Sequence, residues 1–292
     1  FNIERESSDH YQGLFGYFGF GTIQNLSITG TIKGANHVGS VVGYKESGNI
    51  INVYNEAIIK GSNYVGGIVG YNKAGKTEVA YNIGDIEALE TYAGGIVGYL
   101  YNGEVNHTYN RAEILANNAA GGIAGYAYAS YNSRQNIITN SYSAGLVSSN
   151  SNVGGVIGLD QEATYNNNVR TNLYYDTSLI VQYDNPKALK PAVTGHAYGR
   201  TSEQLLTGVS TTLLTTHWYR DLASEGISYY PQLIAFTGHS VNRISEASRL
   251  SVEYEIADGL GTVGMPFIIR DRNDMEELSR KVSEGNTFYQ YY

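Results

Sequence analysis

Val65-Gly66-Gly67-Ile68-Val69-Gly70-Tyr71 decides the fold, because this seven-residue stretch returns throughout the first two thirds of the chain. It recurs as AGGIVGY at 93–99 and AGGIAGY at 120–126, and in divergent form as VGSVVGY at 38–44, VGGVIGL at 153–159 and GLFGY at 13–17. The closing positions are 17, 44, 71, 99, 126 and 159, so the steps are 27, 27, 28, 27 and 33 residues. A fixed period of this length is typical of solenoids, propellers and other repeat arrays.

A second element keeps the same phase as the glycine-rich stretch. Ten residues after the first four closing positions stand Ser27, Tyr54, Tyr81 and Tyr109, and in the last two copies the offset of 16 residues predicts Tyr142 and Tyr175. A third, short apolar run follows, as at 28–32, 57–60 and 112–115. Each unit therefore holds two or three short strands that are rich in Ile, Val and Tyr and bounded by Gly, Asn and Ser.

A unit of 27 residues has too little apolar surface to bury a core by itself, so neighbouring units must stack, with strands about 4.8 Å apart. We therefore predict a mainly all-β protein. Residues 1–185 form a parallel β-helix or β-solenoid of about six coils of 27–33 residues, and a small α+β region follows.

The repeated glycines and tyrosines have architectural roles in this prediction. Glycines with positive φ or without a Cβ let successive backbones lie in register, and the tyrosines can stack in a ladder along one edge. Alternatively, an exposed Tyr/Asn face forms a sugar- or protein-binding strip, and both roles can hold on different faces. The structural repeat positions are Gly16, Tyr17, Gly43, Tyr44, Gly70, Tyr71, Gly98, Tyr99, Gly125, Tyr126 and Gly158.

Residues 186–240 lack the period and are predicted to form a region that caps the solenoid with short helices. Thr201-x-x-Gln204 is a capping box that opens a short helix through Leu206. A second helix is expected over 211–221 around Trp218, and Trp218 is expected to plug the last coil rather than to serve as a ligand platform.

Residues 241–292 are predicted to link the chain to a next module or subunit. The alternation at 250–256 indicates a half-buried strand. A helix is expected to begin at a capping box at Asn273 and to stop at Gly285.

The G-[GL]-[IF]-[VF]-G-Y pattern followed by a Tyr-Asn pair resembles the GLUG repeat family of large bacterial surface proteins. That family includes adhesin-like proteins and the non-catalytic regions of immunoglobulin A metalloproteases. Asn172–Thr177 is similar to its closing "YWDT"-like coil, with Tyr at the usual Trp, and 199–206 and 230–233 are similar to segments that follow the repeats. Residues 258–278 resemble the segment that normally precedes them, although Met265 stands where the family tends to carry an acidic residue.

This resemblance implies that the chain is circularly permuted relative to the usual module. We expect either one period of a tandem array or a head-to-tail filament in which the C-terminal end covers the first coil of the next subunit. The first coil should then be uncovered, or covered by another chain. The residues expected at such an inter-module contact are Phe1, Ile3, Phe288, Tyr289 and Tyr291.

Composition and motifs exclude several classes of function. The net charge is −8, from 27 acidic against 19 basic residues without any basic run, which argues against a nucleic-acid partner. No apolar stretch is long enough to predict a transmembrane segment. The absence of Cys excludes disulfides and thiolate zinc sites, and no HExxH, G-x-S-x-G or phosphate-loop motif is present. We therefore expect no cofactor, no metal-ligating residues and no catalytic residues.

A polysaccharide-cleaving β-helix is the rival prediction, because such enzymes cluster carboxylates on one face. Here the acidic residues do not recur at one phase of the repeat. The densest acidic group is the best candidate for an adventitious Ca²⁺ site, with a solvated loop as the favoured interpretation. It consists of Asp160, Glu162, Asp176 and Asp184.

The sequence and the resemblance together predict an extracellular structural or adhesive protein, a stiff solenoid segment of a surface stalk or head-to-tail filament. A secreted or cell-surface location also agrees with the Cys-free composition rich in Asn, Ser, Thr, Gly and Tyr. Its expected partners are further copies, tandem modules, or a host or cell-surface glycan or protein. The alternatives are a carbohydrate-binding or carbohydrate-cleaving β-helix and the non-catalytic region of a larger exported protease.

Overall fold

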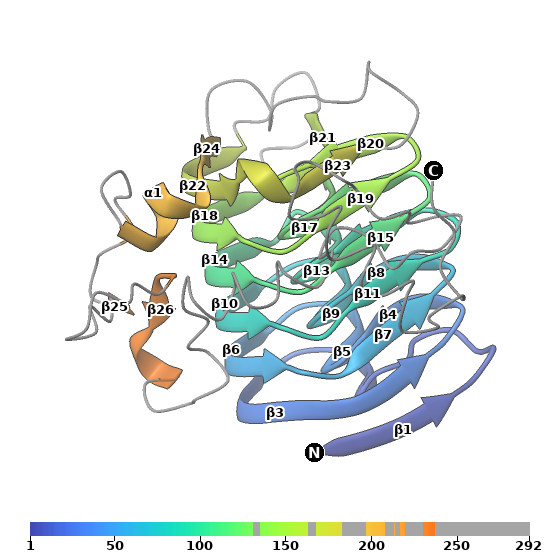
Figure 1. Cartoon of the computed structure of the whole chain (residues 1–292). Coiled ribbons are helices and arrows are strands. Elements are labelled where there is room, and N and C mark those ends of the chain that lie inside the picture. The colour runs from blue at the N-terminus through green and yellow to red at the C-terminus, as the bar shows by residue number, and fades with distance from the viewer. Residues whose placement is uncertain are drawn as a thin grey trace, which may run out of the picture.

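The chain folds as a β-solenoid, in which parallel strands stack coil upon coil from the N-terminal end upward (Figure 1). The computed structural model describes residues 1–130, 135–162, 168–182, 197–207, 213, 217–219 and 230–236. A six-stranded parallel sheet takes one strand from each coil, so the predicted solenoid of about six coils is confirmed.

The largest sheet has 13 strands in two arms that meet at the 12-residue strand β3 (Thr22–Lys33). The first half of β3 pairs with β6 and its second half pairs with β7, while β1 (Asn2–Glu6) lies parallel to its second half. The β6 arm contains β6 (Asn49–Asn55), β10 (Lys76–Asn82), β14 (Glu104–Asn110), β18 (Ile137–Ser143), β22 (Val169–Asp176) and β24 (Ala197–Arg200). The β7 arm contains β7 (Ile58–Gly61), β11 (Ile86–Ala88), β15 (Ile114–Ala116), β19 (Val147–Ser149) and β23 (Ile180–Gln182).

Two further parallel sheets complete each coil. The five-stranded sheet contains β4 (Asn36–Gly39), β8 (Asn63–Gly66), β12 (Tyr92–Gly94), β16 (Ala119–Gly121) and β20 (Asn152–Gly154). The six-stranded sheet contains β2 (Phe15–Phe18), β5 (Val42–Lys45), β9 (Val69–Asn72), β13 (Val97–Tyr101), β17 (Ala124–Ala129) and β21 (Ile157–Glu162). The chain visits the six-stranded sheet, the β6 arm, the β7 arm and the five-stranded sheet in turn.

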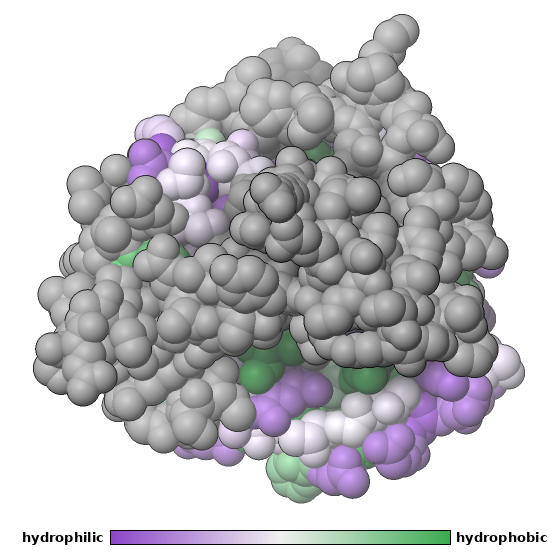
Figure 2. Space-filling model, viewed as in Figure 1, coloured by the Kyte–Doolittle hydropathy of each residue, from purple (hydrophilic) through white to green (hydrophobic). Residues whose placement is uncertain are grey.

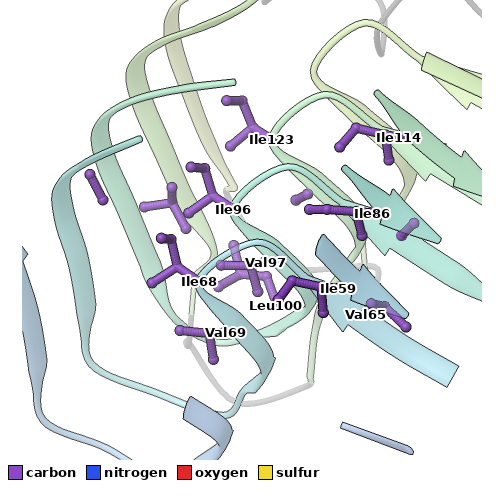
Figure 3. Packing of buried hydrophobic residues seen from close by; sticks show 14 of the residues in the cluster. Ile59, Val65, Ile68, Val69, Ile86, Ile96, Val97, Leu100, Ile114 and Ile123 are labelled. Atoms are coloured by element: carbon purple, nitrogen blue, oxygen red, sulfur yellow. The ribbon is translucent and has the colours of Figure 1, made fainter. Parts of the chain in front are cut away.

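The Ile and Val side chains of the repeat form columns inside the solenoid. Figure 3 shows Ile68, Ile96 and Ile123 one above another, and all three are fully buried. Their backbones continue the column, because Ile68 N donates to Ile96 O at 3.0 Å and Ile96 N donates to Ile123 O at 2.9 Å. Burying one such side chain contributes about 1.5–3 kcal/mol. The coils therefore share one hydrophobic interior, as the period predicts.

A buried asparagine ladder fixes the corner between the two arms. Asn55 Nδ2 donates to Asn82 Oδ1 at 2.7 Å, and Asn82 Nδ2 donates to Asn110 Oδ1 at 2.8 Å. Each of these amides also donates to the carbonyl of the residue two positions later. Because buried polar groups are costly when unpaired, this network holds the corners of these three coils in the same conformation.

The glycines of the repeat are required by close backbone contact rather than by positive φ. A Cβ on Gly67 would lie 2.1 Å from the carbonyl oxygen of Gly95 in the next coil, closer than any side chain permits. A Cβ on Gly70 would be equally crowded, 2.4 Å from a backbone nitrogen. Positive φ occurs instead at glycines outside the repeat, including Gly48 (φ 79°) and Gly75 (φ 77°).

The register of β22 corrects one prediction. Tyr142 lies opposite Tyr174, so the expected Tyr175 is wrong by one residue. The connection from Leu159 spans 15 residues (174 minus 159), whereas the corresponding connection from Tyr126 spans 16 (142 minus 126). The prediction assumed that the connections in the last two coils have the same length. The pairing of β22 with β18 shows that the last connection is one residue shorter. Tyr175 packs instead against the solenoid core.

The 3₁₀ turn η1 (Thr177–Leu179) connects β22 to β23 in the last coil. The region after the solenoid forms several short elements, namely α1 (Ser202–Thr207), β25 (Trp218–Tyr219), β26 (Gln232–Leu233) and the 3₁₀ turn η2 (Ile234–Phe236). The capping box is confirmed: Gln204 N donates to Thr201 Oγ1 at 3.2 Å, and Thr201 N donates to Gln204 Oε1 at 3.0 Å. The predicted second helix is wrong at Trp218–Tyr219, because these residues pair antiparallel with Gln232–Leu233.

None of the described helical elements is long and apolar enough to cross a membrane. The strand predicted at 250–256 and the helix predicted from Asn273 to Gly285 lie outside the described residues.

Candidate functional site

A stack of tyrosines, named here the outer tyrosine column, runs along the six-stranded sheet. It consists of Tyr17, Tyr44, Tyr71, Tyr99 and Tyr126. The centroid distances between successive rings from Tyr17 to Tyr99 are 5.6, 4.9 and 4.7 Å, and neighbouring planes lie within 13°. Tyr126 is turned by 80° to Tyr99, and Leu159 ends the column. Because most rings face each other, the column presents ring edges and hydroxyls along its length rather than ring faces.

A second aromatic row flanks this column on the five-stranded sheet side. Tyr11, His37 and Tyr64 all have positive φ, at 60°, 58° and 56°, and His37 stacks between the two tyrosines at 5.0 Å from each. Burial, together with the nearby His10, lowers the pKa of His37 to about 4. His37 is therefore neutral at pH 7 and extends the aromatic surface.

The hydroxyls of Tyr71 and Tyr99 in the outer column remain protonated at all physiological pH values. Burial, followed by the neighbouring tyrosines, raises the pKa of Tyr71 and of Tyr99 well above the ordinary value. These groups can donate and accept hydrogen bonds, but they supply no phenolate for nucleophilic chemistry.

A second stack, named here the covered tyrosine column, lies on the outer side of the β6 arm. It consists of Tyr54, Tyr81, Tyr109, Tyr142 and Tyr174. From Tyr54 to Tyr142 the ring centroids are 4.7, 4.9 and 5.2 Å apart, and the planes lie within 10°. Tyr81, Tyr109 and Tyr142 have no exposed surface.

Aromatic residues from the C-terminal elements cover this column from the side. The edge of Phe236 meets Tyr81 at 4.8 Å and 85°, and Trp218 lies 5.6 Å from Tyr142. Figure 1 shows α1, β25 and β26 beside the solenoid, next to the β6 arm. The expectation that Trp218 plugs the last coil is therefore wrong, because a tall column of apolar rings on the side of the solenoid offers it a larger surface.

Hydrogen bonds fix this cover to the column. Trp218 Nε1 donates to His107 Nδ1 at 3.0 Å, and Tyr142 Oη donates to the carbonyl oxygen of Pro231 at 2.7 Å. Burial and the nearby His217 lower the pKa of His107 to about 4, so that Nδ1 is a neutral acceptor at pH 7. Sequence reasoning did not find Phe236 as part of this cover. The sequence did show a tyrosine at the same position of successive repeats. Such a row forms a continuous aromatic surface, which another apolar segment is expected to cover.

The two described members of the candidate Ca²⁺ group, Asp160 and Asp176, are engaged in separate contacts. Asp160 forms a buried ion pair with Arg170, with Oδ2 at 2.9 Å from Nε, inside the sixth coil. Asp176 accepts hydrogen bonds from Ser202 at 2.7 Å and Tyr230 at 2.9 Å. Both carboxylates thus serve the fold. The Glu162 side chain and Asp184 lie outside the described residues, within which no group of three His, Asp or Glu is placed to hold a metal ion.

Lys45 is a buried cation that sequence reasoning did not single out. Its Nζ donates to the carbonyl oxygen of Lys76 at 2.7 Å and to Asn72 Oδ1 at 3.3 Å. Burial lowers its pKa to about 7, although the charge of Glu104 opposes the shift. Because two oxygen acceptors hold the amine inside the coils, we interpret Lys45 as a structural group.

The N-terminal end of the solenoid exposes aromatic side chains. Phe20 is 87% exposed, Tyr17 is 60% exposed and Phe15 is 43% exposed. No described strand pairs with the outer edge of β2. Figure 2 shows apolar surface beside hydrophilic surface along the lower edge of the view, where β1 and β3 lie in Figure 1.

The predicted inter-module residues fall into different environments. Phe1 is 67% exposed, and its ammonium group donates to Ser27 O at 2.7 Å. Ile3 is half-buried and packs against the core of its own solenoid, so it is less available to a neighbour. Phe288, Tyr289 and Tyr291 lie outside the described residues.

Comparisons with family models, curated proteins and solved structures found no match for this chain. The resemblance to GLUG repeats therefore stays a prediction.

Proposed function

We propose that this chain is a non-enzymatic structural and adhesive segment of an extracellular or cell-surface assembly. In this role the solenoid is a stiff spacer that displays its lateral surface to a glycan or protein, and it joins neighbouring modules or subunits end to end. The Cys-free, Asn- and Tyr-rich composition and the predicted likeness to bacterial surface repeats support the location.

The single observation that supports end-to-end joining is the partly open first coil: the chain's own β1 covers the second half of β3, but no described strand covers the first half of β3 or the outer edge of β2. Phe20, Tyr17 and Phe15 are exposed at the same end as the unpaired edge of β2. Burial of Phe20 alone would remove most of a large aromatic surface from water. An unpaired parallel edge also accepts a further strand through its backbone groups.

Because the coils repeat, a copy added at the end would continue several features of the solenoid at once. The coils share one pattern of parallel pairing, so an added coil would extend the interior and the outer tyrosine column, which reaches Tyr17 in the first coil. The contact joins different surfaces of two copies and does not close on itself, so it would produce a filament.

Analytical ultracentrifugation and electron microscopy of the whole chain test this proposal. We expect concentration-dependent association into linear particles, and we expect Phe20→Lys to abolish it by placing a charge at the open end. Leu89→Lys is the matched control, because Leu89 is also in a bend and 62% exposed but lies on the side of the solenoid.

A chain that stays monomeric over the accessible concentration range would contradict the proposed filament. Equal loss of association in Phe20→Lys and Leu89→Lys would also contradict it, since association would then not depend on the first coil.

A further inference from the structure

Lys45 and Asn72 bring an amine and a carboxamide together inside the solenoid. The two residues lie opposite each other in the parallel pairing of β5 with β9, one coil apart (Figure 1). Neither residue has any exposed surface. Leu100 follows Asn72 at the same position of the next coil, and Figure 3 shows its side chain among the apolar side chains of the interior. The pair therefore occupies a position that is apolar in the next coil.

The Lys45 amine is held against this carboxamide. Its Nζ donates to Asn72 Oδ1 at 3.3 Å and to the carbonyl oxygen of Lys76 at 2.7 Å. Lys76 is the first residue of β10, so the second contact fixes the amine at the corner that leads into the β6 arm. Because Oδ1 is bonded directly to Cγ, the first contact places the amine nitrogen beside the carbonyl carbon of Asn72.

The amide nitrogen of Asn72 is not held in the same way. Asn72 Nδ2 is buried and has no hydrogen-bond partner among the described residues. Asn82 of the buried ladder, in contrast, donates from Nδ2 to two acceptors. A Cβ on Gly103 would lie 2.9 Å from Asn72 Nδ2, so the missing side chain leaves space beside this nitrogen. An unpaired buried donor costs free energy of folding, and its departure would remove that cost.

Burial makes the Lys45 amine a nucleophile at neutral pH. An ordinary Lys is an ammonium ion at pH 7 and has no lone pair with which to react. Burial lowers the pKa of Lys45 to about 7, although the charge of Glu104 favours the ammonium form. A substantial fraction of the amine is therefore neutral at pH 7, as in lysines that act as nucleophiles.

We propose that Lys45 and Asn72 form an intramolecular amide bond that joins β5 to β9. The lone pair of Lys45 Nζ attacks Cγ of Asn72, a new C–N bond forms, and the bond between Cγ and Nδ2 breaks. One proton passes from Nζ to Nδ2, which leaves as ammonia, and Oδ1 remains as the carbonyl oxygen of the new amide. Nothing is oxidised or reduced, so the step needs no further reactant.

The bond links the second and third copies of the repeat. It closes a loop of 27 residues (72 minus 45) in a chain that has no Cys and therefore no disulfide. Such a cross-link reduces the conformational freedom of the unfolded chain, as a disulfide does, and so stabilises the fold. The proposal does not rest on the end-to-end assembly, because both residues belong to one chain.

Mass spectrometry of the whole chain under denaturing conditions tests the proposal. We expect a mass below the sequence mass by one molecule of ammonia. Trypsin cleaves after Lys33, Lys60 and Lys73 but not after an acylated Lys45, so residues 34–60 should remain joined to residues 61–73. Tandem spectra of this branched peptide should locate the new amide between Lys45 and Asn72.

Two variants remove the two reacting groups separately. Lys45→Met keeps a long side chain without the amine, and Asn72→Leu introduces the residue that the next coil has at this position. Each should have its full sequence mass and unfold several degrees below the natural chain. Lys60→Met is the matched control, because Lys60 contacts Glu87 at a partly exposed position. It should still lose ammonia.

Three results would overturn the proposal. The first is the full sequence mass in the folded natural chain, and the second is a digest without the branched peptide of residues 34–60 and 61–73. The third is a loss of ammonia that persists in Lys45→Met. This last result would assign the loss to a succinimide at Asn102-Gly103, where the same atoms would leave without any contribution from Lys45.

Discussion

The two tyrosine columns of this solenoid have the same ring spacing but different surroundings. Tyr71 and Tyr99 of the outer column stack at 4.7 Å and keep their edges in solvent. Tyr81 and Tyr109 of the covered column stack at 4.9 Å and are fully buried. The ladder itself is a local consequence of the repeat, whereas burial depends on the segment around Trp218 and Phe236, more than 70 residues further along the chain.

The difference shows that one repeated residue type can serve two purposes. Stacking of two rings contributes about 0.5–1.5 kcal/mol beyond the burial of area in either column. Only the covered column adds the removal of whole rings from water. The outer column keeps ring edges at the surface for contacts outside the chain, although Tyr126 Oη already donates to Gln161 Oε1.

The largest expected difference comes from removing one ring from each column. Tyr109→Ala should lower the free energy of unfolding by about 3–5 kcal/mol, because it leaves a cavity under Trp218. Tyr71→Ala should cost only about 1 kcal/mol, since it mainly loses stacking. Urea unfolding followed by circular dichroism measures both. Equal losses would show that the cover contributes little.

The next largest loss of stability is expected at a glycine that sets the distance between coils, and with it the ring spacing in both columns. Gly67→Ala should cost about 1–3 kcal/mol or more, because the new methyl group would collide with the carbonyl oxygen of Gly95 and disturb adjacent coils. Gly19→Ala is the control, since its Cβ would meet only a Tyr17 ring carbon at 3.7 Å. Thermal unfolding distinguishes them. A stable Gly67→Ala would mean that the rings, not the backbone, set the coil spacing.

A pH titration examines how the cover is attached. The pKa of His107 is lowered from 6.5 to about 4, so the folded state favours the neutral ring that accepts from Trp218 Nε1. The stabilisation is complete above pH 6.5 and is lost as the pH falls from 6.5 through 4. Fluorescence of Trp218, the single Trp of the chain, should change as the pH falls through about 4, where His107 gains its proton in the folded state.

Two asparagine variants give the controls for this titration. His107→Asn should remove the change, because Asn occupies the same positive-φ position in other coils, such as Asn52 and Asn140. His37 lies beside the outer tyrosine column, so His37→Asn should leave the pH-dependent fluorescence change intact. A change that persists in His107→Asn would assign the pH dependence to another group.

The smallest effect is expected at the exposed ion pairs between coils. Lys60 Nζ lies 2.7 Å from Glu87 Oε2 on the β7 arm, and both side chains are partly exposed. Lys60→Ala should cost less than about 1 kcal/mol, and the cost should fall further in 1 M NaCl because salt screens exposed charges. Urea unfolding at two salt concentrations measures it. A larger, salt-independent loss would mean that charge ladders stabilise the stack as strongly as rings do.

The candidate site was predictable in part. The phase of the repeat placed Tyr44, Tyr71 and Tyr99 in one column, because each coil starts a new strand at the same position. The count failed at Tyr175, where a shorter connection moved Tyr174 into register. The cover of the second column could not be predicted, since Phe236 reaches Tyr81 only through the folding of the C-terminal segment over the side of the solenoid.

The sequence by itself determined the coils, because a period of 27–28 residues with glycine at every close backbone contact allows only stacked parallel strands over most of the solenoid. It also determined the interior, since Ile and Val recur at the inward positions. Only the tertiary structure decided which tyrosine column is covered and where Trp218 lies. These depend on contacts between segments far apart in the chain, for which the repeat carries no signal.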